Sequence, residues 1–299
     1  MSLVEKALRK LQESAPTKTG RPHAEAASKG SEPAVRRPQP VAEPPVPERI
    51  VPVSIASLRA AGLLPPAGEE RRLAQQYRQI KRPLIMNAMG RGTARLPNGH
   101  LIMVASAMPG EGKTFTTLNL ALSMSMEKDV HVLLVDADVA KPHISALLGV
   151  ADAPGLLDAL RDQHLDVERL ISPTDIPNLS ILPAGTRSQQ ATELLASARM
   201  EEVMCSLGLG DERRIALFDS PPLLLTTESQ ALAQAAGQVV VVVRAGVTSQ
   251  QTLLDGLSHL GQHPAVSLVL NQDSLMTNAG SYYGGYGDNR PPLPETEHT

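Results

Sequence analysis

The stretch Ser106-Ala107-Met108-Pro109-Gly110-Glu111-Gly112-Lys113-Thr114 follows an apolar run, Leu101 to Ala105, and leads into a helical segment, Thr114 to Met126. A glycine-rich turn between a strand and a helix, closed by Lys-Thr, is the setting in which a phosphate-binding loop has meaning. Ala107 takes the place of the first glycine in the pattern G-x-x-x-x-G-K-[ST]. The sequence therefore predicts a nucleotide phosphate site in an α/β fold.

Each residue type in this loop has a use at the phosphates of ATP. Glycine lets the backbone N–H groups turn inward without a Cβ in the way, and the helix N-terminus adds unpaired N–H groups. Lys113 is expected to reach the β- and γ-oxygens, and the Thr114 hydroxyl to ligate Mg²⁺. The predicted ATP-binding residues of the loop are Pro109, Gly110, Glu111, Gly112, Lys113, Thr114 and Phe115.

The remainder of the body alternates apolar runs with helical segments. The runs are Leu101 to Ala105, Val130 to Val135, Leu179 to Leu182, Ile215 to Phe218, Val239 to Val243 and Val266 to Leu270. Helices are expected over Glu69 to Met86, Thr114 to Met126, Gln190 to Leu207, Glu228 to Ala236 and Ser249 to Leu260. Strands this uniformly apolar are covered on both faces, which predicts a P-loop NTPase fold with a mainly parallel sheet and helices on both faces.

Two of the predicted strands end in carboxylates. Asp136 and Asp138 follow one run, and Asp219 follows another. Near Mg·ATP such carboxylates can hold the metal or accept a proton, so the predicted metal ligands are Thr114, Asp136 and Asp219. The predicted catalytic residues are Lys113, Asp136, Asp138 and Asp219, with either Asp136 or Asp138 as proton acceptor. The alternative for each is a helix N-cap or turn carboxylate, most of all for Asp138, which precedes Pro142.

Composition excludes several classes of function. The 299 residues are 42% apolar, enough for one sizeable core, but only 2% are aromatic and none is Trp, which argues against nucleic acid as a partner. The single cysteine, Cys205, excludes an internal disulfide and a zinc site built on several thiolates. No apolar run approaches the length of a membrane span, and the first residues lack signal-peptide features. We expect a cytoplasmic protein that meets a membrane only at its surface or through a partner.

The two ends of the chain differ from the body. Residues 1–13 have apolar residues at helical spacing and predict an amphipathic helix, and residues 14–66 predict a disordered Pro-rich linker. Residues 1–82 carry 15 Lys and Arg against 8 Asp and Glu, a net +7, whereas the remainder carries 13 against 23, a net −10. The flexible tail predicted over residues 277–299 holds three of the four tyrosines, Tyr282, Tyr283 and Tyr286.

Ser106 to Thr114, Val132 to Pro142 and Ile215 to Pro222 together resemble the Walker A, Walker A′ and Walker B motifs of bacterial tyrosine kinases (BY-kinases), which belong to the deviant Walker, MinD-like P-loop superfamily. The resemblance covers about Glu69 to Asn271 and marks residues 67–276 as the kinase domain. Residues 1–8 and 77–84 are similar to the exosortase-associated tyrosine autokinases of exopolysaccharide biosynthesis.

This resemblance implies an autokinase that moves the γ-phosphoryl of ATP onto Tyr282, Tyr283 and Tyr286 of another copy and thereby regulates exopolysaccharide synthesis and export. It implies ATP and Mg²⁺ as cofactors, a homo-oligomer, and a separate membrane polysaccharide copolymerase as activator that holds the chain at the inner membrane. The ring-forming E-x-x-R-x-x-R helix of the family corresponds to Gln75, Arg78 and Lys81, where the acid is absent. Asn271 is expected either to contact adenine or to serve as a simple turn residue.

Two other functions are compatible with part of the pattern. An ATPase switch of the ParA/MinD type shares the fold and the strand-end aspartates, but it carries a second loop lysine at the position of Met108. An ATP-gated scaffold without enzymatic activity is the other alternative. Phosphate release without phosphotyrosine would favour the switch, and nucleotide binding with neither product would favour the scaffold.

Overall fold

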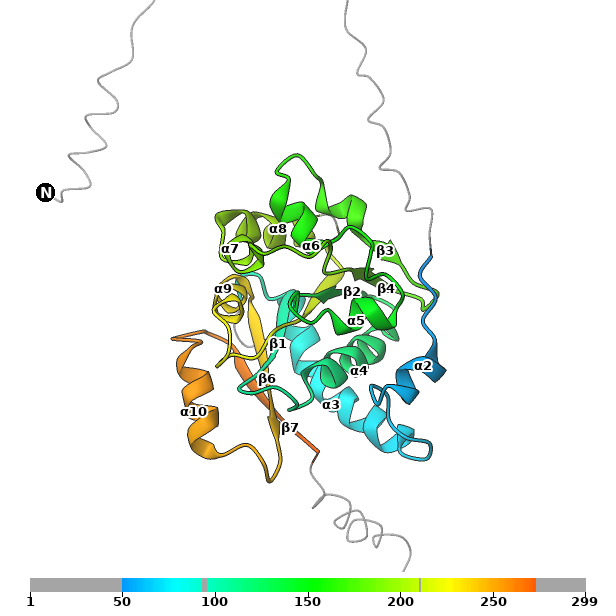
Figure 1. The fold of residues 1–299 in the computed structure, drawn as a ribbon. Helices are drawn as coiled ribbons and strands as arrows, with labels where there is room; N and C mark the ends of the chain where they lie inside the picture. The colour runs from blue at the N-terminus through cyan, green and yellow to red at the C-terminus, as the bar shows by residue number, and fades with distance from the viewer. Residues whose placement is uncertain (1–49, 93–95, 210, 273–299) are drawn as a thin grey trace, which may run out of the picture. The chain divides into compact units, whose positions relative to one another are not determined.

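A computed structural model describes residues 50–92, 96–209 and 211–272 (Figure 1). Its seven-stranded sheet has the order β3-β4-β2-β5-β1-β6-β7, and every neighbouring pair is parallel except β3 and β4. The mainly parallel sheet predicted from the sequence is thus confirmed. The strands are β1 (Leu101–Ser106), β2 (His131–Asp136), β3 (Ser172–Pro173), β4 (Leu179–Leu182), β5 (Arg214–Asp219), β6 (Gln238–Arg244) and β7 (Val266–Asn271).

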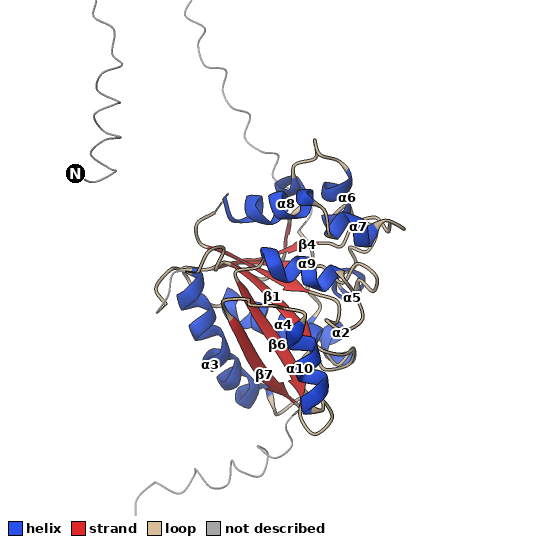
Figure 2. Cartoon of the chain, turned by 90° about the vertical axis from the view of Figure 1, so that its left-hand side faces the viewer, coloured by secondary structure: helices blue, strands red, loops and turns tan. Residues whose placement is uncertain are grey.

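Helices cover both faces of this sheet (Figure 2). One face carries α2 (Ile55–Ala60), α3 (Glu70–Ala88), α4 (Lys113–Ser125) and α5 (His143–Leu147). The other carries α6 (Leu156–Arg161), the 3₁₀ helix η1 (Val167–Leu170), α7 (Ala191–Leu195), α8 (Ala198–Leu209), α9 (Glu228–Ala235) and α10 (Gln250–Ser258). The single helix predicted over 190–207 is therefore two helices, α7 and α8. None of the helices in the described part of the chain has both the length and the apolar character needed to cross a bilayer.

Strand β1 shows why the central runs are apolar throughout. Leu101, Met103 and Ala105 belong to the core beneath α6 to α10, whereas Ile102 and Val104 belong to the core beneath α2 to α5. Successive side chains of a strand point to opposite faces, so a strand between two helical layers needs an apolar residue at every position. The site therefore sits on a rigid central sheet.

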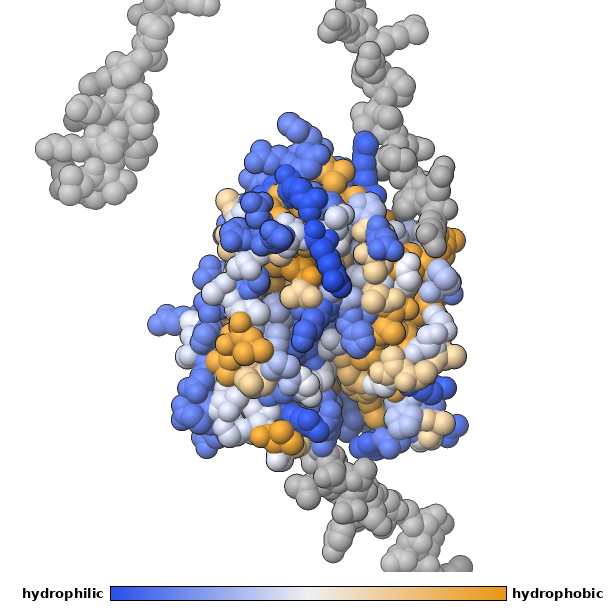
Figure 3. All heavy atoms as spheres, in the orientation of Figure 1, coloured by the Kyte–Doolittle hydropathy of each residue, from blue (hydrophilic) through white to orange (hydrophobic). Residues whose placement is uncertain are grey.

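Strand β7 departs from this expectation. It pairs with β6 alone among the described strands, and its apolar side chains Val266, Leu268 and Leu270 are 38%, 54% and 59% exposed. The prediction that every apolar run is covered on both faces is wrong for this strand, because a run of apolar letters does not reveal whether a strand is central or at an edge. On the face shown in Figure 3, hydrophobic side chains likewise form separate patches between hydrophilic ones.

The linker predicted over residues 14–66 is wrong over residues 50–66, which are part of the folded body. The Val51 N–H donates to the carbonyl of Pro173 at 2.9 Å, and Leu58 of α2 is buried in the core beside α4. Asn119 of α4 also donates to the carbonyl of Leu63 at 2.8 Å. Composition misplaced this boundary because the prolines of residues 14–49 give the whole stretch the character of a linker, whereas residues 50–66 hold three prolines and ten apolar residues. The predicted helix over residues 1–13 and the tail over residues 277–299 lie outside the described residues.

Candidate active site

The phosphate loop lies between the end of β1 and the start of α4. Gly110 and Gly112 have φ values of 79° and 98°, in the left-handed region that favours glycine. A Cβ added to Gly112 would lie only 2.0 Å from Nδ2 of Asn271. Among the described residues, no acceptor is recorded for the backbone N–H groups of Gly110, Glu111 and Gly112. These groups and the N-terminus of α4 can together bind the oxygens of a phosphate.

The side chain of Glu111 braces the loop from within. It is 3% exposed, and it accepts hydrogen bonds from the Met108 N–H at 2.9 Å and from the Thr248 hydroxyl. The Glu111 carbonyl accepts from Nδ2 of Asn271 at 2.9 Å. Glu111 can therefore reach a nucleotide only through its backbone, and Asn271 supports the loop from the end of β7. The contact of Asn271 with adenine stays a prediction.

Ala107 fits the loop because glycine stands opposite it. Ala107 is buried and does not adopt a positive φ, so this position does not require glycine for its backbone conformation. A Cβ added to Gly256 of α10 would lie 3.0 Å from the Cβ of Ala107. The methyl group that departs from the general motif is thus accommodated where α10 passes close to the loop.

Asp219 lies at the end of β5, directly beneath the first turn of α4. Its Oδ2 accepts from the Thr114 hydroxyl at 2.8 Å, and its Oδ1 accepts from the Thr117 hydroxyl at 3.1 Å. Residues three apart on a helix share one face, so both threonines point at the same carboxylate. Burial raises the pKa of Asp219 to about 6, although both hydroxyls and Lys113 act in the opposite direction. Two of the three predicted metal ligands, Thr114 and Asp219, are in contact.

Asp136 is the register partner of Asp219 on the neighbouring strand β2. Its Oδ2 accepts from both the N–H and the hydroxyl of Ser145, each at 2.7 Å. No hydrogen-bond partner among the described residues reaches its buried Oδ1. Burial raises the pKa of Asp136 to about 7, and the nearby Asp219 and Asp138 add to the shift. A buried carboxylate oxygen without a donor, beside a second carboxylate, is an arrangement that a cation would stabilise.

Asp138 borders an open cavity of about 620 Å³ that begins at the phosphate loop. Burial raises the pKa of Asp138, and Lys113 opposes that shift. The cavity is lined by Pro109, Gly110, Lys113, Thr114, Asp138, Ala140, Lys141, Pro142, His143, Arg187, Pro221, Pro222, Leu225 and Thr226. Of the three strand-end aspartates, only Asp138 is among these lining residues.

Sequence reasoning missed several residues of this site. Ser145, Lys141 and Arg187 received no role, although Ser145 binds Asp136 and the two cations line the cavity. Lys141 lies within the same motif as Asp136 and Asp138, and this position in the sequence could have indicated that it is close to the site. Arg187 lies in a loop after β4, far away in sequence, and carried no such signal.

Two other predicted positions do not line the cavity at Asp138. Phe115 packs against the core beneath α3 and lines, together with Asn271, a cavity separate from the one at Asp138. Its contact with ATP stays a prediction. Lys81, at the last position of the predicted ring-forming set, is buried. Its Nζ donates to the Ser123 carbonyl at 2.5 Å and pairs with Glu127 at 2.8 Å. Lys81 therefore links α3 to α4 within one chain.

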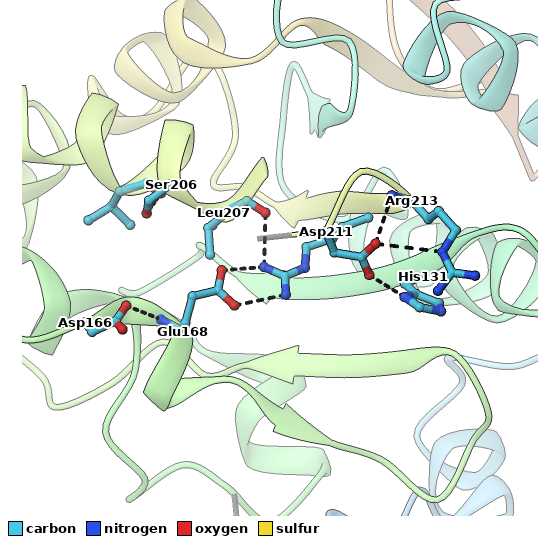
Figure 4. A network of polar contacts seen from close by, with 9 residues as sticks. His131, Asp166, Glu168, Ser206, Leu207, Asp211 and Arg213 are labelled. Atoms are coloured by element: carbon cyan, nitrogen blue, oxygen red, sulfur yellow. Dashed lines mark hydrogen bonds and ion pairs between the residues drawn. The ribbon is translucent and has the colours of Figure 1, made fainter. Parts of the chain in front are cut away.

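Internal ion pairs lie at the opposite edge of the sheet (Figure 4). Arg214, at the start of β5, binds the Glu168 carboxylate through two nitrogens, at 2.5 and 2.9 Å. His131, at the start of β2, pairs with Asp211. These groups pair with one another, although Nε2 of the neighbouring His100 has no hydrogen-bond partner among the described residues and borders an open cavity of about 760 Å³. The carboxyl edge differs in its chemistry, because there an unpaired carboxylate oxygen and free backbone N–H groups lie beside the phosphate loop. The carboxyl edge is also where ligands bind in open parallel sheets.

The fold and this site define a P-loop nucleotide-binding protein with two adjacent strand-end carboxylates. The AAA domain family matches residues 99–267, more than half of the chain. The putative tyrosine-protein kinase EpsB of Ralstonia nicotianae is 30% identical over 193 residues, which are 62% of this chain and 25% of EpsB. The tyrosine-protein kinase YwqD of Bacillus subtilis is 27% identical over 72% of this chain and 86% of YwqD.

The solved kinase domain of VpsO is 28% identical and superposes with a TM-score of 0.56, covering 69% of this chain and 98% of that domain. The chain therefore belongs to the AAA domain family and, within it, to the bacterial tyrosine kinases. The resemblance to the bacterial tyrosine kinases is thereby confirmed, whereas the similarity to their exosortase-associated members stays a prediction. The match to this chain covers only about a quarter of the length of EpsB.

Proposed function

We propose that this chain is an ATP-dependent protein-tyrosine autokinase that phosphorylates Tyr282, Tyr283 and Tyr286 of another copy and thereby regulates exopolysaccharide synthesis and export. The main support for this proposal is that one and the same cavity is lined by the phosphate loop, by Lys113 and by Asp138. A donor phosphoryl and an acceptor side chain would meet within it. The names of the relatives support a tyrosine as the acceptor.

The residues of the site fit a magnesium ion. The unpaired Oδ1 of Asp136, the Asp219 carboxylate and the Thr114 hydroxyl are the hard oxygen ligands that Mg²⁺ prefers. No group of three or more His, Cys, Asp or Glu in the described part of the chain could hold a metal alone, which agrees with an ion that takes its other ligands from phosphate and water. When bound, Mg²⁺ would neutralise charge on the β- and γ-phosphates.

Asp138 is the proton acceptor in this proposal. A phenol with a pKa near 10 is mostly protonated at neutral pH, so its attack on phosphorus requires a base within reach. Asp138 lines the cavity, whereas Asp136 does not and has one oxygen held by Ser145. The tyrosyl oxygen bonds to the γ-phosphorus as the bond to the β–γ bridging oxygen breaks, ADP leaves, and the phenolic proton passes to Asp138.

Lys113 and the loop N–H groups stabilise the charge that develops on the transferred group. Lys113 is buried at the first position of α4, where the helix dipole adds to its charge. Phosphoryl transfer asks little covalent chemistry of the protein, so positioning and electrostatics dominate the catalytic effect. The same groups would bind ATP in the ground state.

Incubation of the purified chain with γ-labelled ATP and Mg²⁺ tests this proposal. The parent is expected to incorporate label, while Lys113→Met and the triple Tyr282/Tyr283/Tyr286→Phe variant are expected to lose it. Mixing Lys113→Met with the triple variant should restore label on the Lys113→Met copy, since transfer occurs between copies. Equal labelling of Lys113→Met and the parent would overturn the site assignment, and equal labelling of the triple variant would overturn the tail assignment.

The strongest competing function is an ATPase switch of the ParA/MinD type. Met108 cannot supply the second lysine that such switches carry, and its N–H is used by Glu111. Production of ADP and free phosphate with no phosphotyrosine would favour this alternative. The kinase is further proposed to be cytoplasmic and to be activated at the inner membrane by a membrane polysaccharide copolymerase, because the family resemblance implies such a partner.

A further inference from the structure

The active-site cavity is also lined by two cations outside the phosphate loop, one of them beside the proposed base. The N–H of Lys141 donates to Oδ1 of Asp138 at 3.3 Å, and the Lys141 charge opposes the rise in the pKa of that carboxyl. Lys141 follows the acidic motif at the end of β2, and Arg187 follows β4; both line the cavity that Asp138 borders. Neither side chain forms an ion pair within 4.0 Å with a residue that the structure describes, whereas Arg161, Arg199 and Arg214 do. With Lys113 engaged by the nucleotide, Lys141 and Arg187 are two cations against the one carboxylate, Asp138, among the lining residues of the cavity.

The backbone that carries Arg187 is fixed in place. Oδ2 of Asp158 accepts from the N–H groups of Gly155 and Thr186, each at 2.9 Å. Gly185 has a φ of 89°, and a Cβ there would lie 2.6 Å from that same oxygen. Arg161 also donates to the Thr186 carbonyl at 3.2 Å. The turn after β4 is therefore anchored on α6, and this anchoring holds Arg187 at the cavity.

The neighbouring wall is apolar. Pro221, Pro222 and Leu225 line the same cavity, and Leu225 is 60% exposed. An aromatic ring laid against these residues would bury apolar surface and bring its hydroxyl towards Asp138. The cavity thus combines a place for an aromatic acceptor with a cationic wall that would attract a negative charge near it.

We infer that Lys141 and Arg187 form a subsite for a negatively charged side chain located a few residues from the acceptor tyrosine. The inference rests on the proposed kinase function and specifies its substrate class: acidic or already phosphorylated tyrosine segments. In the tail, Tyr283 and Tyr286 are three residues apart, roughly 10 Å when extended. Phosphorylation of one tyrosine therefore makes the segment a better substrate for transfer to the next, and Asp288 supplies a carboxylate before any transfer.

Peptides with a single acceptor test the subsite. Their sequence is that of residues 278–290, with Tyr283 as acceptor, Phe at position 282, Asn at position 288, and Phe, Asp or phosphotyrosine at position 286. The enzyme is the full chain with its three tail tyrosines changed to Phe, so that no internal acceptor competes. At low salt, kcat/KM should be about fivefold higher with phosphotyrosine than with Phe, with Asp between them, and the difference should shrink as salt is added.

Variants of the wall separate a subsite from a structural role. Arg187→Ala should lower the preference for phosphotyrosine, Arg187→Glu should reverse it, and Lys141→Ala should act like Arg187→Ala. The KM for ATP should stay within twofold in each variant. Arg169→Ala, which removes an exposed cation from η1, should keep the full preference.

The outcomes distinguish the two levels of the proposal. If no peptide is phosphorylated, the proposed kinase function fails. If all three peptides react at equal rates, or if Arg187→Glu keeps the parent preference, the subsite fails while the kinase function stands. A preference for phosphotyrosine with no response to Asp would restrict the subsite to phosphate.

Discussion

Asp136 and Asp219 illustrate at the residue scale how burial prepares a site for a cation. Burial raises the pKa of Asp136 from its ordinary 3.8 to about 7 and that of Asp219 to about 6. At pH 5 both carboxyls are therefore mostly protonated in the folded, nucleotide-free protein, whereas at pH 8 both are mostly ionised. The contribution of these groups to stability is fully present below pH 4 and is lost as the pH rises towards 7.

The Asp136→Asn substitution should remove much of this pH dependence. For the parent, Asp136 alone is expected to lower the free energy of unfolding by about 2 kcal/mol between pH 5 and pH 8. In Asp136→Asn that difference should shrink, and urea unfolding in EDTA at the two pH values measures it. Asp162→Asn, at an exposed position before η1, is the control and should match the parent. An unchanged difference in Asp136→Asn would contradict the raised pKa.

Substitutions of Asp138 and Asp219 are expected to have different effects, the first on the rate of phosphoryl transfer and the second on nucleotide binding. Asp138→Asn removes the proposed base and should lower the rate of tyrosine phosphorylation by about 10²-fold, with nucleotide affinity within a few fold of the parent. Asp219→Asn should instead weaken Mg·ATP binding itself. Titration with a fluorescent nucleotide, together with single-turnover transfer, gives both quantities. A transfer rate within twofold of the parent in Asp138→Asn would move the base elsewhere.

The residues of the phosphate loop could be predicted from the sequence because their spacing encodes their chemistry. Lys113, Thr114 and the strand-end aspartates each lie in a short continuous motif that can be recognised in the sequence. Ser145 and Arg187 could not be predicted in this way, because distant partners hold them at the site: the Ala184 N–H donates to the Ser145 hydroxyl of α5, and Asp158 fixes the turn before Arg187. Such contacts depend on tertiary packing and leave no pattern in the local sequence.

At the scale of elements, the phosphate loop depends on the approach of β7. Gly112→Ala would place a Cβ 2.0 Å from Nδ2 of Asn271 and would also strain a left-handed residue. We expect a loss of nucleotide affinity of at least about tenfold, which corresponds to about 1.4 kcal/mol. Gly261→Ala is the matched control, because its φ is also positive but no atom lies within 4 Å of the added Cβ. Equal nucleotide affinities in the two variants, by calorimetry, would contradict this role of Asn271.

The segment before α3 offers a second test at this scale. Leu58 is 2% exposed and Ile55 is 43% exposed, although both belong to α2. Leu58→Ala should lower the free energy of unfolding by about 2 to 4 kcal/mol, and Ile55→Ala by less than about 1 kcal/mol. Chemical denaturation of the full chain measures both. Equal, small effects would mean that residues 50–66 behave as the linker that composition suggests.

The errors of sequence reasoning about elements share one physical origin. The apolar runs located every major strand, because burial on both faces leaves no polar position. The same runs did not reveal that β7 lies at the edge of the sheet. The proline-rich composition of the preceding residues likewise did not reveal that Val51 and Leu58 belong to the core. Whether an apolar residue is covered depends on which elements arrive beside it, and that information is not local.

For the whole molecule, one parallel sheet, two buried carboxylates and an open cavity support the proposed kinase that acts on another copy of itself. The family membership supports this function, and the carboxyl edge of the sheet supplies every group that the proposal uses. At the amino edge, Arg214 is paired with Glu168. The predicted acceptor tyrosines lie outside the described residues, and labelling of the triple Phe variant tests their role.

The most direct test is mass spectrometry of the purified chain after incubation with Mg·ATP. The account predicts phosphotyrosine at one or more of Tyr282, Tyr283 and Tyr286 in the parent, and none in Lys113→Met or when EDTA removes the metal. Release of ADP and phosphate without any phosphotyrosine would contradict the kinase assignment.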